Sequence, residues 1–231
     1  MKLYAICGTG GFGREVMPLA ENMLGQQHPD DFRIVFVSEG KDAGSTINNH
    51  PVFDMQQFFS HEAKERHFSI AIANHEIRKR IAEFMQSKGA KPFEIVAAEH
   101  VRLAENIIGE GAIFCSFTTV TSNAVIGKHF HANIYSYVAH DCVIGDYVTF
   151  APGVHCNGNV IVEDGVYAGT GVIIRQGQPG KPLVIGKNAV LGMGAVVTAS
   201  VPPGVTVVGN PARPFVRKNT VLPAESGVHH D

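Results

Sequence analysis

The chain has 231 residues, and its 19 Lys and Arg against 21 Asp and Glu give a formal net charge of −2 at pH 7. This balance lacks the basic footprint of a nucleic-acid-binding protein, and 45% hydrophobic residues are typical of a globular chain. No apolar run approaches the roughly 20 residues that span a bilayer. The four cysteines form no CxxC pair and the first residues do not resemble a signal peptide, so we expect a cytoplasmic protein with reduced thiols.

The first ~95 residues alternate strand-like and helix-like segments. Apolar runs at 3–7, 33–37, 68–73 and 93–96 are typical of buried strands. Helical spacing of apolar residues appears at 15–24, 55–65 and 76–88. Strands that alternate with helices predict a small parallel sheet with helical crossovers, a Rossmann-like α/β domain.

The second half has a six-residue period. Chance would produce twelve successive apolar residues at this spacing roughly once in ten thousand trials. The series is Ile108, Phe114, Val120, Ile126, Ala132, Val138, Ile144, Phe150, Cys156, Val162, Ala168 and Ile174. Four residues after each comes a second small or apolar series, with Phe130 as its one bulky member. This period predicts a parallel β-helix whose framing residues fill a narrow core.

Glycine and proline residues within the repeat predict where the coil bends and where it is interrupted. Glycine follows the framing residue at Gly109, Gly127, Gly145 and Gly169, where we expect sharp corners. A polar Gly/Pro segment at 175–183 interrupts the register, which resumes at Ile185. We therefore expect three parts: residues 1–98, a Rossmann-like domain; residues 99–212, a β-helix; and residues 213–231, a C-terminal tail.

Several motifs carry a resemblance to a known family. They are GTGGFGREV (8–16), IANHEIRKRI (72–81), AHDCVIGD (139–146), CNGNV (156–160), IRQGQPGKPLVIG (174–186) and VVGNPAR (207–213). The chain resembles the hexapeptide-repeat acyltransferases, which form trimers of left-handed triangular β-helices. It is similar to their nucleotide-sugar subgroup, which includes the bacillosamine-pathway and TDP-4-amino-4,6-dideoxy-sugar N-acetyltransferases and the sialic-acid O-acetyltransferases. The resemblance implies an α/β Rossmann-like N-terminal domain followed by a left-handed parallel β-helix.

The resemblance also implies an activity. It predicts an acetyl-CoA-dependent N-acetyltransferase, a cytoplasmic homotrimer that acetylates a nucleotide-linked 4-amino-4,6-dideoxy sugar for O-antigen, capsule or glycan assembly. TDP and UDP are the expected nucleotides, with GDP open. Two alternatives stay open: O-acetylation of a sialic-acid-type sugar, and a non-catalytic module that binds a nucleotide sugar. Free sugars as acceptors would favour the first, and failure to bind CoA the second.

His140 is the candidate general base, because an imidazole titrates near neutrality and the matching histidine of relatives has that role. Asp141 would orient it. Residues 18 apart stack in this family, which places Gly158 next to His140 with a backbone N–H for the oxyanion. The same step links Asn123, Asp141 and Asn159 in a polar ladder. His140 as a surface corner residue, and the Asn residues as corner stabilisers, are the structural alternatives.

Two further observations concern histidines. Some relatives carry a second histidine at the position of Thr149, where this chain has only a hydroxyl. His129 and His131 form an HxH pair, which could bind zinc as the histidines of β-helical carbonic anhydrases do. The nucleotide-binding motif fits that family poorly, so we expect no metal.

The motif GxGxxG in 8–13 follows a strand and precedes a helix, so its backbone N–H groups suit a diphosphate. An NAD site is the competing interpretation, but no hydride-transfer site or second half-domain is visible. We expect the nucleotide sugar to contact eight residues: Gly8, Gly10, Gly11, Gly13, Ser38, Glu39, Asn74 and Arg78. Ser38 and Glu39 stand where relatives often have paired aspartates, and Arg78 could equally be a solvated helix charge.

The CoA site is expected along the later coils. Backbone groups around Gly169, Thr170 and Gly194 would line the pantetheine arm, and the segment Gly209, Asn210 and Pro211 would lie near the adenine. Arg175 and Lys187 are candidate partners of the CoA phosphates, weighed against ordinary exposed charges.

Overall fold

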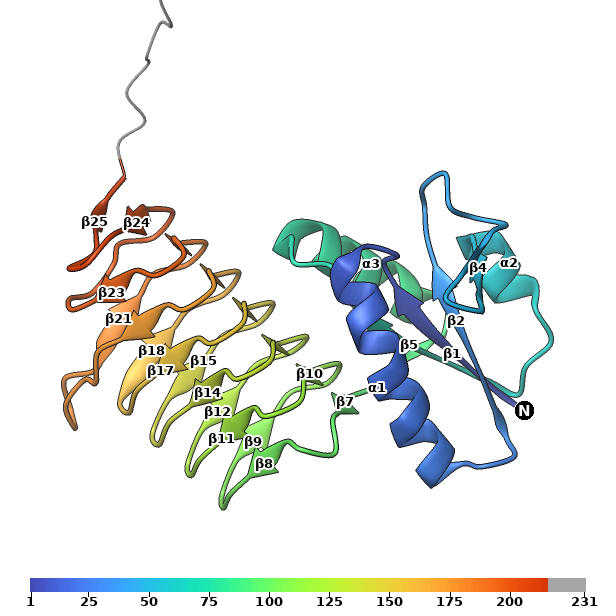
Figure 1. The fold of residues 1–231 in the computed structure, drawn as a ribbon, viewed down its shortest axis with the longest axis horizontal. Coiled ribbons are helices and arrows are strands. Elements are labelled where there is room, and N and C mark those ends of the chain that lie inside the picture. The colour runs from blue at the N-terminus through green and yellow to red at the C-terminus, as the bar shows by residue number, and fades with distance from the viewer. Residues whose placement is uncertain (216–231) are drawn as a thin grey trace, which may run out of the picture.

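A computed structural model of the chain describes residues 1–215. Figure 1 shows an α/β domain that packs beside the first turns of a long β-helical coil. Of the expected tail, β25 (Arg213–Pro214) pairs antiparallel with β24 (Thr206–Val208), and residues 216–231 lie outside the described residues. Within residues 1–215, no helix combines the length and the apolar character needed to cross a membrane.

The N-terminal domain contains a six-stranded sheet in the order β3-β4-β2-β1-β5-β6, with β1 parallel to both β2 and β5. Its strands are β1 (Lys2–Cys7), β2 (Phe32–Val37), β3 (Thr46–Ile47), β4 (His50–Phe53), β5 (Glu65–Ile70) and β6 (Lys91–Pro92). Its helices are α1 (Gly11–Gln27), α2 (Met55–Ser60) and α3 (His75–Ser87). The α/β prediction is confirmed.

Local details of this domain differ from the prediction. Helix α2 ends at Ser60, because the chain from Glu65 onward joins the sheet as β5, three residues before the predicted strand. The β3–β4 hairpin was not predicted. Its turn residues Asn48 and Asn49 have φ of 47° and 68°, a left-handed conformation that Asn tolerates better than most residues.

The rest of the chain is a left-handed parallel β-helix, as predicted. Strands of two or three residues stack into three sheets. From β7 to β20, paired strands lie 18 residues apart, as Ile113 and His131 do, and the pairs that span the 175–183 segment lie 23 residues apart, as Tyr167 and Val190 do. The strands are β7 (Ile95–Val96), β8 (Val101–Arg102), β9 (Ile107–Ile108), β10 (Ile113–Phe114), β11 (Thr119–Val120), β12 (Val125–Ile126), β13 (His131–Ala132), β14 (Tyr137–Val138), β15 (Val143–Ile144), β16 (Thr149–Phe150), β17 (His155–Cys156), β18 (Val160–Val162), β19 (Tyr167–Ala168), β20 (Ile173–Ile174), β21 (Leu183–Ile185), β22 (Val190–Leu191), β23 (Val196–Val197), β24 and β25. Since β7 pairs with β10, the coil begins at Ile95, a few residues before the division expected at 99.

The framing residues fill the coil as the six-residue period predicts. All twelve are buried except Ile108, which the first turn covers only in part. Phe130 belongs in this core, where its ring meets Phe150 edge-on at 5.2 Å and Phe114 at 5.9 Å. The 175–183 segment is an excursion from the coil, and β21 resumes the stack by pairing with β18.

The glycines after the framing residues have a different role from the one predicted. A Cβ on Gly127 would lie 2.6 Å from the carbonyl carbon of Gly145, and one on Gly145 would lie 2.6 Å from the backbone nitrogen of Asp164. These glycines therefore permit close approach of successive turns. The sharp bend falls two residues later, where Tyr147 and Gly171 have φ of 58° and 70°.

Positive-φ residues stack along three edges of the coil, and we name each edge by its surroundings. The catalytic edge, named for the candidate base His140 that precedes Asp141, contains Glu105, Asn123, Asp141 and Asn159. The domain edge contains Gly111, His129, Tyr147, Gly165 and Asn188. The glycine edge contains Phe117, Tyr135, Gly153, Gly171 and Gly194.

Candidate active site

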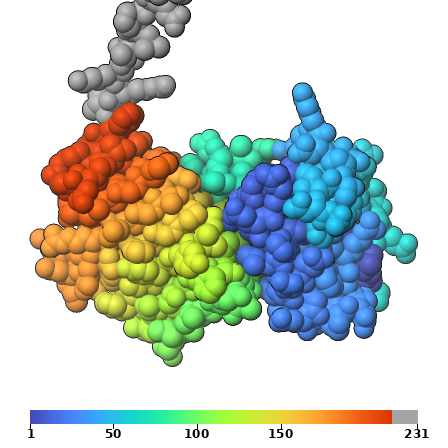
Figure 2. Space-filling view, in the orientation of Figure 1, coloured from blue at the N-terminus to red at the C-terminus, as the bar shows by residue number. Residues whose placement is uncertain are grey.

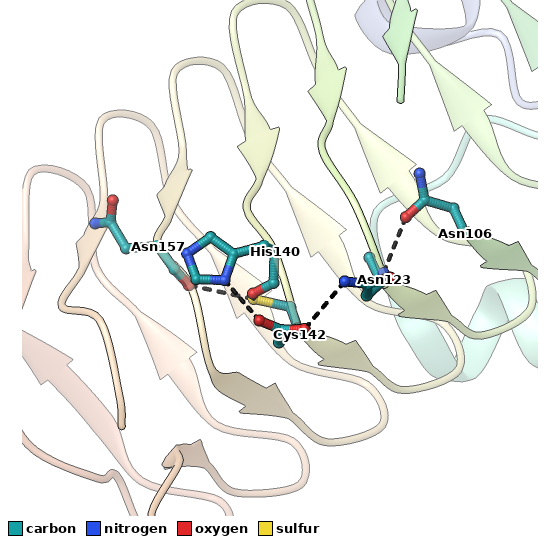
Figure 3. Close-up of polar contacts among 7 residues, drawn as sticks. Asn106, Asn123, His140, Cys142 and Asn157 are labelled. Atoms are coloured by element: carbon teal, nitrogen blue, oxygen red, sulfur yellow. Dashed lines mark hydrogen bonds and ion pairs between the residues drawn. The ribbon is translucent and has the colours of Figure 1, made fainter. Parts of the chain in front are cut away.

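His140 and Asp141 form a hydrogen-bonded pair on the catalytic edge (Figure 3). The Nδ1 atom of His140 lies 2.7 Å from Oδ2 of Asp141. Adjacent side chains point apart on a regular strand, but Asp141 has φ of 58°, and this bend brings the two together. Because a carboxylate only accepts, Nδ1 carries the proton and Nε2 is left as an acceptor. The side chains are 49% and 48% exposed, so the pair is accessible from solvent.

Gly158 lies directly against the imidazole of His140. A Cβ at this position would be 2.5 Å from both Cε1 and Nε2 of the ring, so only glycine allows the observed placement. The N–H of Gly158 donates to no acceptor within residues 1–215. An imidazole nitrogen that can accept a proton thus lies next to a backbone N–H without an acceptor, which are the two groups that acyl transfer to an amine requires.

The polar ladder along the catalytic edge is partly formed. Asn123 Nδ2 lies 3.4 Å from Oδ1 of Asp141 (Figure 3). One turn earlier, Asn106 accepts from the N–H of Ala124 at 2.9 Å. Asn159 contributes its backbone, donating to the carbonyl of His140 at 3.0 Å. The ladder therefore supports Asp141 from the Asn123 side.

Asn157 holds the segment that precedes Gly158, a role that sequence reasoning missed. Its Oδ1 accepts from the Tyr137 hydroxyl at 2.8 Å, and its Nδ2 donates to the carbonyl of Ile174 at 2.7 Å. Its own carbonyl oxygen lies 3.2 Å from Sγ of Cys142. These contacts tie the segment before Gly158 to Tyr137 of β14, to Ile174 of β20 and to Cys142, and so hold its backbone in place.

Four of the eight predicted nucleotide-sugar residues, Gly8, Gly10, Ser38 and Glu39, line one cavity in the N-terminal domain, which we call the candidate nucleotide cavity; the other four are not among its lining residues. This cavity of about 300 Å³ is lined by Cys7, Gly8, Thr9, Gly10, Val37, Ser38, Glu39, Met55, Ile72, Ile77 and Ile81. Helix α1 begins at Gly11 with no side-chain cap, so its first N–H groups are free for an anion. A Cβ on Gly13 would lie 2.0 Å from the carbonyl oxygen of Gly8, which explains the third glycine of the motif. Asn74 caps α3 by accepting from Ile77 N–H at 2.9 Å.

Two polar contacts beside this cavity were not predicted. Arg80 of α3 holds both carboxylate oxygens of Glu39, at 3.0 and 2.5 Å. The hydroxyl of Thr9 donates to Asp42 at 2.8 Å. Both contacts join segments more than 30 residues apart, so no local sequence signal could have revealed them.

Arg78 corrects a prediction, because its side chain is fully buried and does not face the nucleotide cavity. Its guanidinium donates to the carbonyl of Ile72 at 2.7 Å, to Nδ1 of His131 at 2.9 Å and to Oγ1 of Thr149 at 3.0 Å, and also to the carbonyl of Tyr147. Burial without a carboxylate lowers its pKa to about 9. Arg78 joins the two domains; it is not a solvated helix charge.

The histidines of the HxH pair belong to the same interface. Since Arg78 only donates, His131 accepts at Nδ1 and donates from Nε2 to the carbonyl of Ile70 at 2.8 Å. Burial holds the pKa of His131 well below its usual value and lowers that of His129 to about 4. Phe12 of the glycine loop packs on the His131 ring at 5.0 Å. Within residues 1–215, no group of three or more His, Cys, Asp or Glu is arranged to hold a metal ion.

The predicted CoA residues fall on different edges of the coil. Gly169, Thr170 and Gly194 lie together at the glycine edge, where Gly194 N–H donates to the Thr170 carbonyl at 2.8 Å, and the segment 209–211 follows at the next level. Arg175 instead lines a cavity of about 240 Å³ beside the 175–183 excursion.

Lys187 is also apart from the glycine edge. It lies on the domain edge, 3.6 Å from Asp164, and lines the 560 Å³ cavity between α3 and the coil. Figure 2 shows the α3 segment lying over this junction of the two domains. One chain alone therefore does not gather Arg175 and Lys187 around the other CoA residues.

Comparison with known proteins agrees with this architecture. Residues 4–85 match the model of the PglD N-terminal domain, and residues 123–158 match the model of the bacterial transferase hexapeptide (six repeats).

Three relatives extend along most of the chain. A GDP-perosamine N-acetyltransferase of Escherichia coli O157:H7 is 47% identical, with 96% of this chain and 100% of the relative covered. The structure of WeeI from Acinetobacter baumannii AYE is 51% identical with a TM-score of 0.88, covering 93% and 100% of the two chains. The acetyltransferase domain of PglB from Neisseria gonorrhoeae FA1090, in complex with acetyl coenzyme A, is 28% identical with a TM-score of 0.79, covering 93% and 98%. This chain therefore belongs to the hexapeptide-repeat nucleotide-sugar N-acetyltransferases.

Proposed function

We propose that the protein transfers the acetyl group of acetyl-CoA to the C4 amine of a GDP-linked 4-amino-4,6-dideoxy sugar. The observation that carries the proposal is the His140–Asp141 pair with the Gly158 N–H beside it. The choice of GDP rests on the 47% identity, over the whole length of the relative, to an enzyme named for GDP-perosamine. GDP thus replaces TDP and UDP as the first expectation. Acetyl-CoA as donor is supported by its presence in the PglB complex.

The reaction proceeds by direct attack. The amine lone pair adds to the thioester carbon, Gly158 N–H stabilises the oxyanion, and Nε2 of His140 takes the proton lost by the nitrogen. Collapse of the tetrahedral adduct breaks the C–S bond, and the departing sulfur takes up a proton to give free CoA. No covalent enzyme intermediate is required. The product would supply O-antigen, capsule or another glycan.

A homotrimer completes the site in this proposal. The catalytic and glycine edges are opposite borders of the sheet that contains β14 and β17, so the predicted CoA residues at the glycine edge do not lie beside His140 of the same chain. In the proposed trimer, the glycine edge of a neighbouring chain brings the donor to His140. A row of half-exposed apolar residues supports such an interface: Ile107, Val125 and Val143 are 67%, 41% and 45% exposed. A solution mass three times that of the chain is expected by light scattering; a monomer would refute this arrangement.

An acceptor panel tests the activity. Purified protein is incubated with acetyl-CoA and GDP-, UDP- or TDP-linked 4-amino-4,6-dideoxy sugars, and thiol release is followed together with amide formation. We expect one thiol per amide with the GDP sugar. Release with free sialic acids alone would instead identify an O-acetyltransferase, and lack of both release and CoA binding would indicate a non-catalytic binding module.

A further inference from the structure

The Glu39–Arg80 pair lies beside the nucleotide cavity but takes part in no step described above. Glu39 follows β2 and Arg80 projects from α3, and the two terminal nitrogens of the guanidinium, Nη1 and Nη2, reach the carboxylate. The two side chains are 45% and 59% exposed, so a ligand can reach both. The pair connects α3 to the segment after β2, whereas Arg78 connects α3 to the coil.

Glu39 lines the candidate nucleotide cavity, whereas Arg80, which is bound to it, lines the 560 Å³ cavity between α3 and the coil. A diphosphate at the start of α1 would place the nucleoside farther along the candidate nucleotide cavity, between apolar side chains such as Val37, Met55 and Ile81. Glu39 lines both this cavity and its neighbour of about 360 Å³. A second carboxylate, Asp42, accepts from Thr9 in the glycine loop and so lies at the phosphate and ribose end. Glu39 is thus free for the base.

Resting on the proposed function, we propose that Glu39 and Arg80 recognise guanine as a pair. The carboxylate accepts the N1–H and N2–H donors of the base, and the guanidinium donates to O6 and N7. Guanine presents these two donors and two acceptors next to one another, so an adjacent anion and cation complement it. Uracil and thymine place a carbonyl oxygen on each side of their single N–H and would meet the carboxylate with like charge.

The chemistry of both side chains suits this role near neutral pH. The hydrogen bond from Arg80 lowers the pKa of Glu39, which keeps it ionised and able only to accept. Each carboxylate oxygen has two lone pairs, so Glu39 can keep one contact with Arg80 while it accepts from the base. Arg80 remains protonated and offers its other N–H groups.

Calorimetry with modified nucleotides tests the proposal on the full-length protein. Dissociation constants are measured for GDP, for inosine diphosphate, which lacks the N2 amine, for 7-deaza-GDP, which lacks N7, for 2′-deoxy-GDP and for UDP. We expect inosine diphosphate and UDP to bind about 10- to 100-fold more weakly than GDP. Glu39→Gln should weaken the binding of GDP and make the dissociation constants of GDP and inosine diphosphate nearly equal. Arg80→Gln should make the dissociation constants of GDP and 7-deaza-GDP nearly equal.

The controls separate this proposal from its alternatives. Lys79→Gln and Glu83→Gln remove an exposed ion pair from the same helix and should leave all ratios unchanged. If Glu39→Gln weakens the binding of GDP and of UDP by the same factor, and the wild type binds 2′-deoxy-GDP much more weakly than GDP, Glu39 contacts the ribose and guanine recognition is overturned. If neither variant changes the dissociation constant of GDP, the two residues form only a surface ion pair and the proposal is wrong. Wild-type preference for UDP would refute the proposed GDP substrate itself, and acetyl transfer to a GDP sugar without base discrimination would refute only this inference.

Discussion

Replacing Gly158 by Ala tests whether the close approach of glycine and imidazole matters for catalysis. The new Cβ would lie 2.5 Å from Cε1 and Nε2 of His140, whereas nonbonded carbon atoms rest at about 3.5–4.0 Å. The ring must therefore move by about 1 Å. Because His140 is 49% exposed, it can do so without disrupting the core. A displacement of about 1 Å can cost about 100-fold in rate, so we expect kcat to fall by about that factor.

The assay is steady-state CoA release with saturating acceptor, accompanied by the melting temperature and the KM for acetyl-CoA. The melting temperature and the KM for acetyl-CoA should change little. Gly25→Ala is the matched control, because a Cβ on this glycine of α1 meets no atom within 4 Å and the helix gains about 0.5–1 kcal/mol. Gly158→Ala with kcat within about threefold of wild type would refute the reasoning, since the base would then tolerate the displacement.

Three other substitutions probe the tautomer, the domain junction and a buried histidine. Asp141→Asn should lower kcat by at least 10-fold with little change in KM, because an amide no longer holds the proton on Nδ1 of His140; an unchanged pH–rate profile would contradict this. Arg78→Met leaves the buried oxygens of Ile72 and Tyr147 and a nitrogen of His131 without a donor. Because the variant no longer buries a cation, part of this cost is offset, and the free energy of unfolding should fall by about 3 kcal/mol, which calorimetry would show as a Tm about 6–12 °C lower. Lys79→Met is the control and should leave Tm unchanged. The folded-state pKa of His129, about 4, lies below its ordinary 6.5, so its neutral form stabilises the fold above pH 6.5 and this contribution is lost as pH falls towards 4. His129→Phe should therefore flatten the decline of Tm between pH 6.5 and 4, and an equally steep decline would exclude His129 as its source.

The six-residue period predicted the coil, because each framing position has to be apolar to fill a core only one side chain wide. The stacking of Gly158 on His140 followed from this repeat together with the 18-residue turn that the family resemblance implied. Sequence reasoning misplaced the bends, however. Whether a bend falls at Gly145 or at Tyr147 depends on backbone φ, and aromatic residues adopt the left-handed conformation here when turns stack above and below.

Contacts between distant segments escaped prediction for a different reason. Arg78 has the pattern of an exposed helix charge, and only the fold brings His131 and Thr149 to it. The Glu39–Arg80 pair likewise joins residues 41 positions apart. Such pairings depend on how two domains or two elements pack, which local periodicity does not encode.

The central claim is that His140 is the base for acetyl transfer to a nucleotide-linked amine. The most direct measurement compares wild type with His140→Asn for the turnover of a GDP-linked 4-amino-4,6-dideoxy sugar and for the dissociation constants of CoA and GDP. The account predicts a fall in kcat of about 10²- to 10⁴-fold with both dissociation constants unchanged. Turnover by His140→Asn within a few-fold of wild type would contradict it.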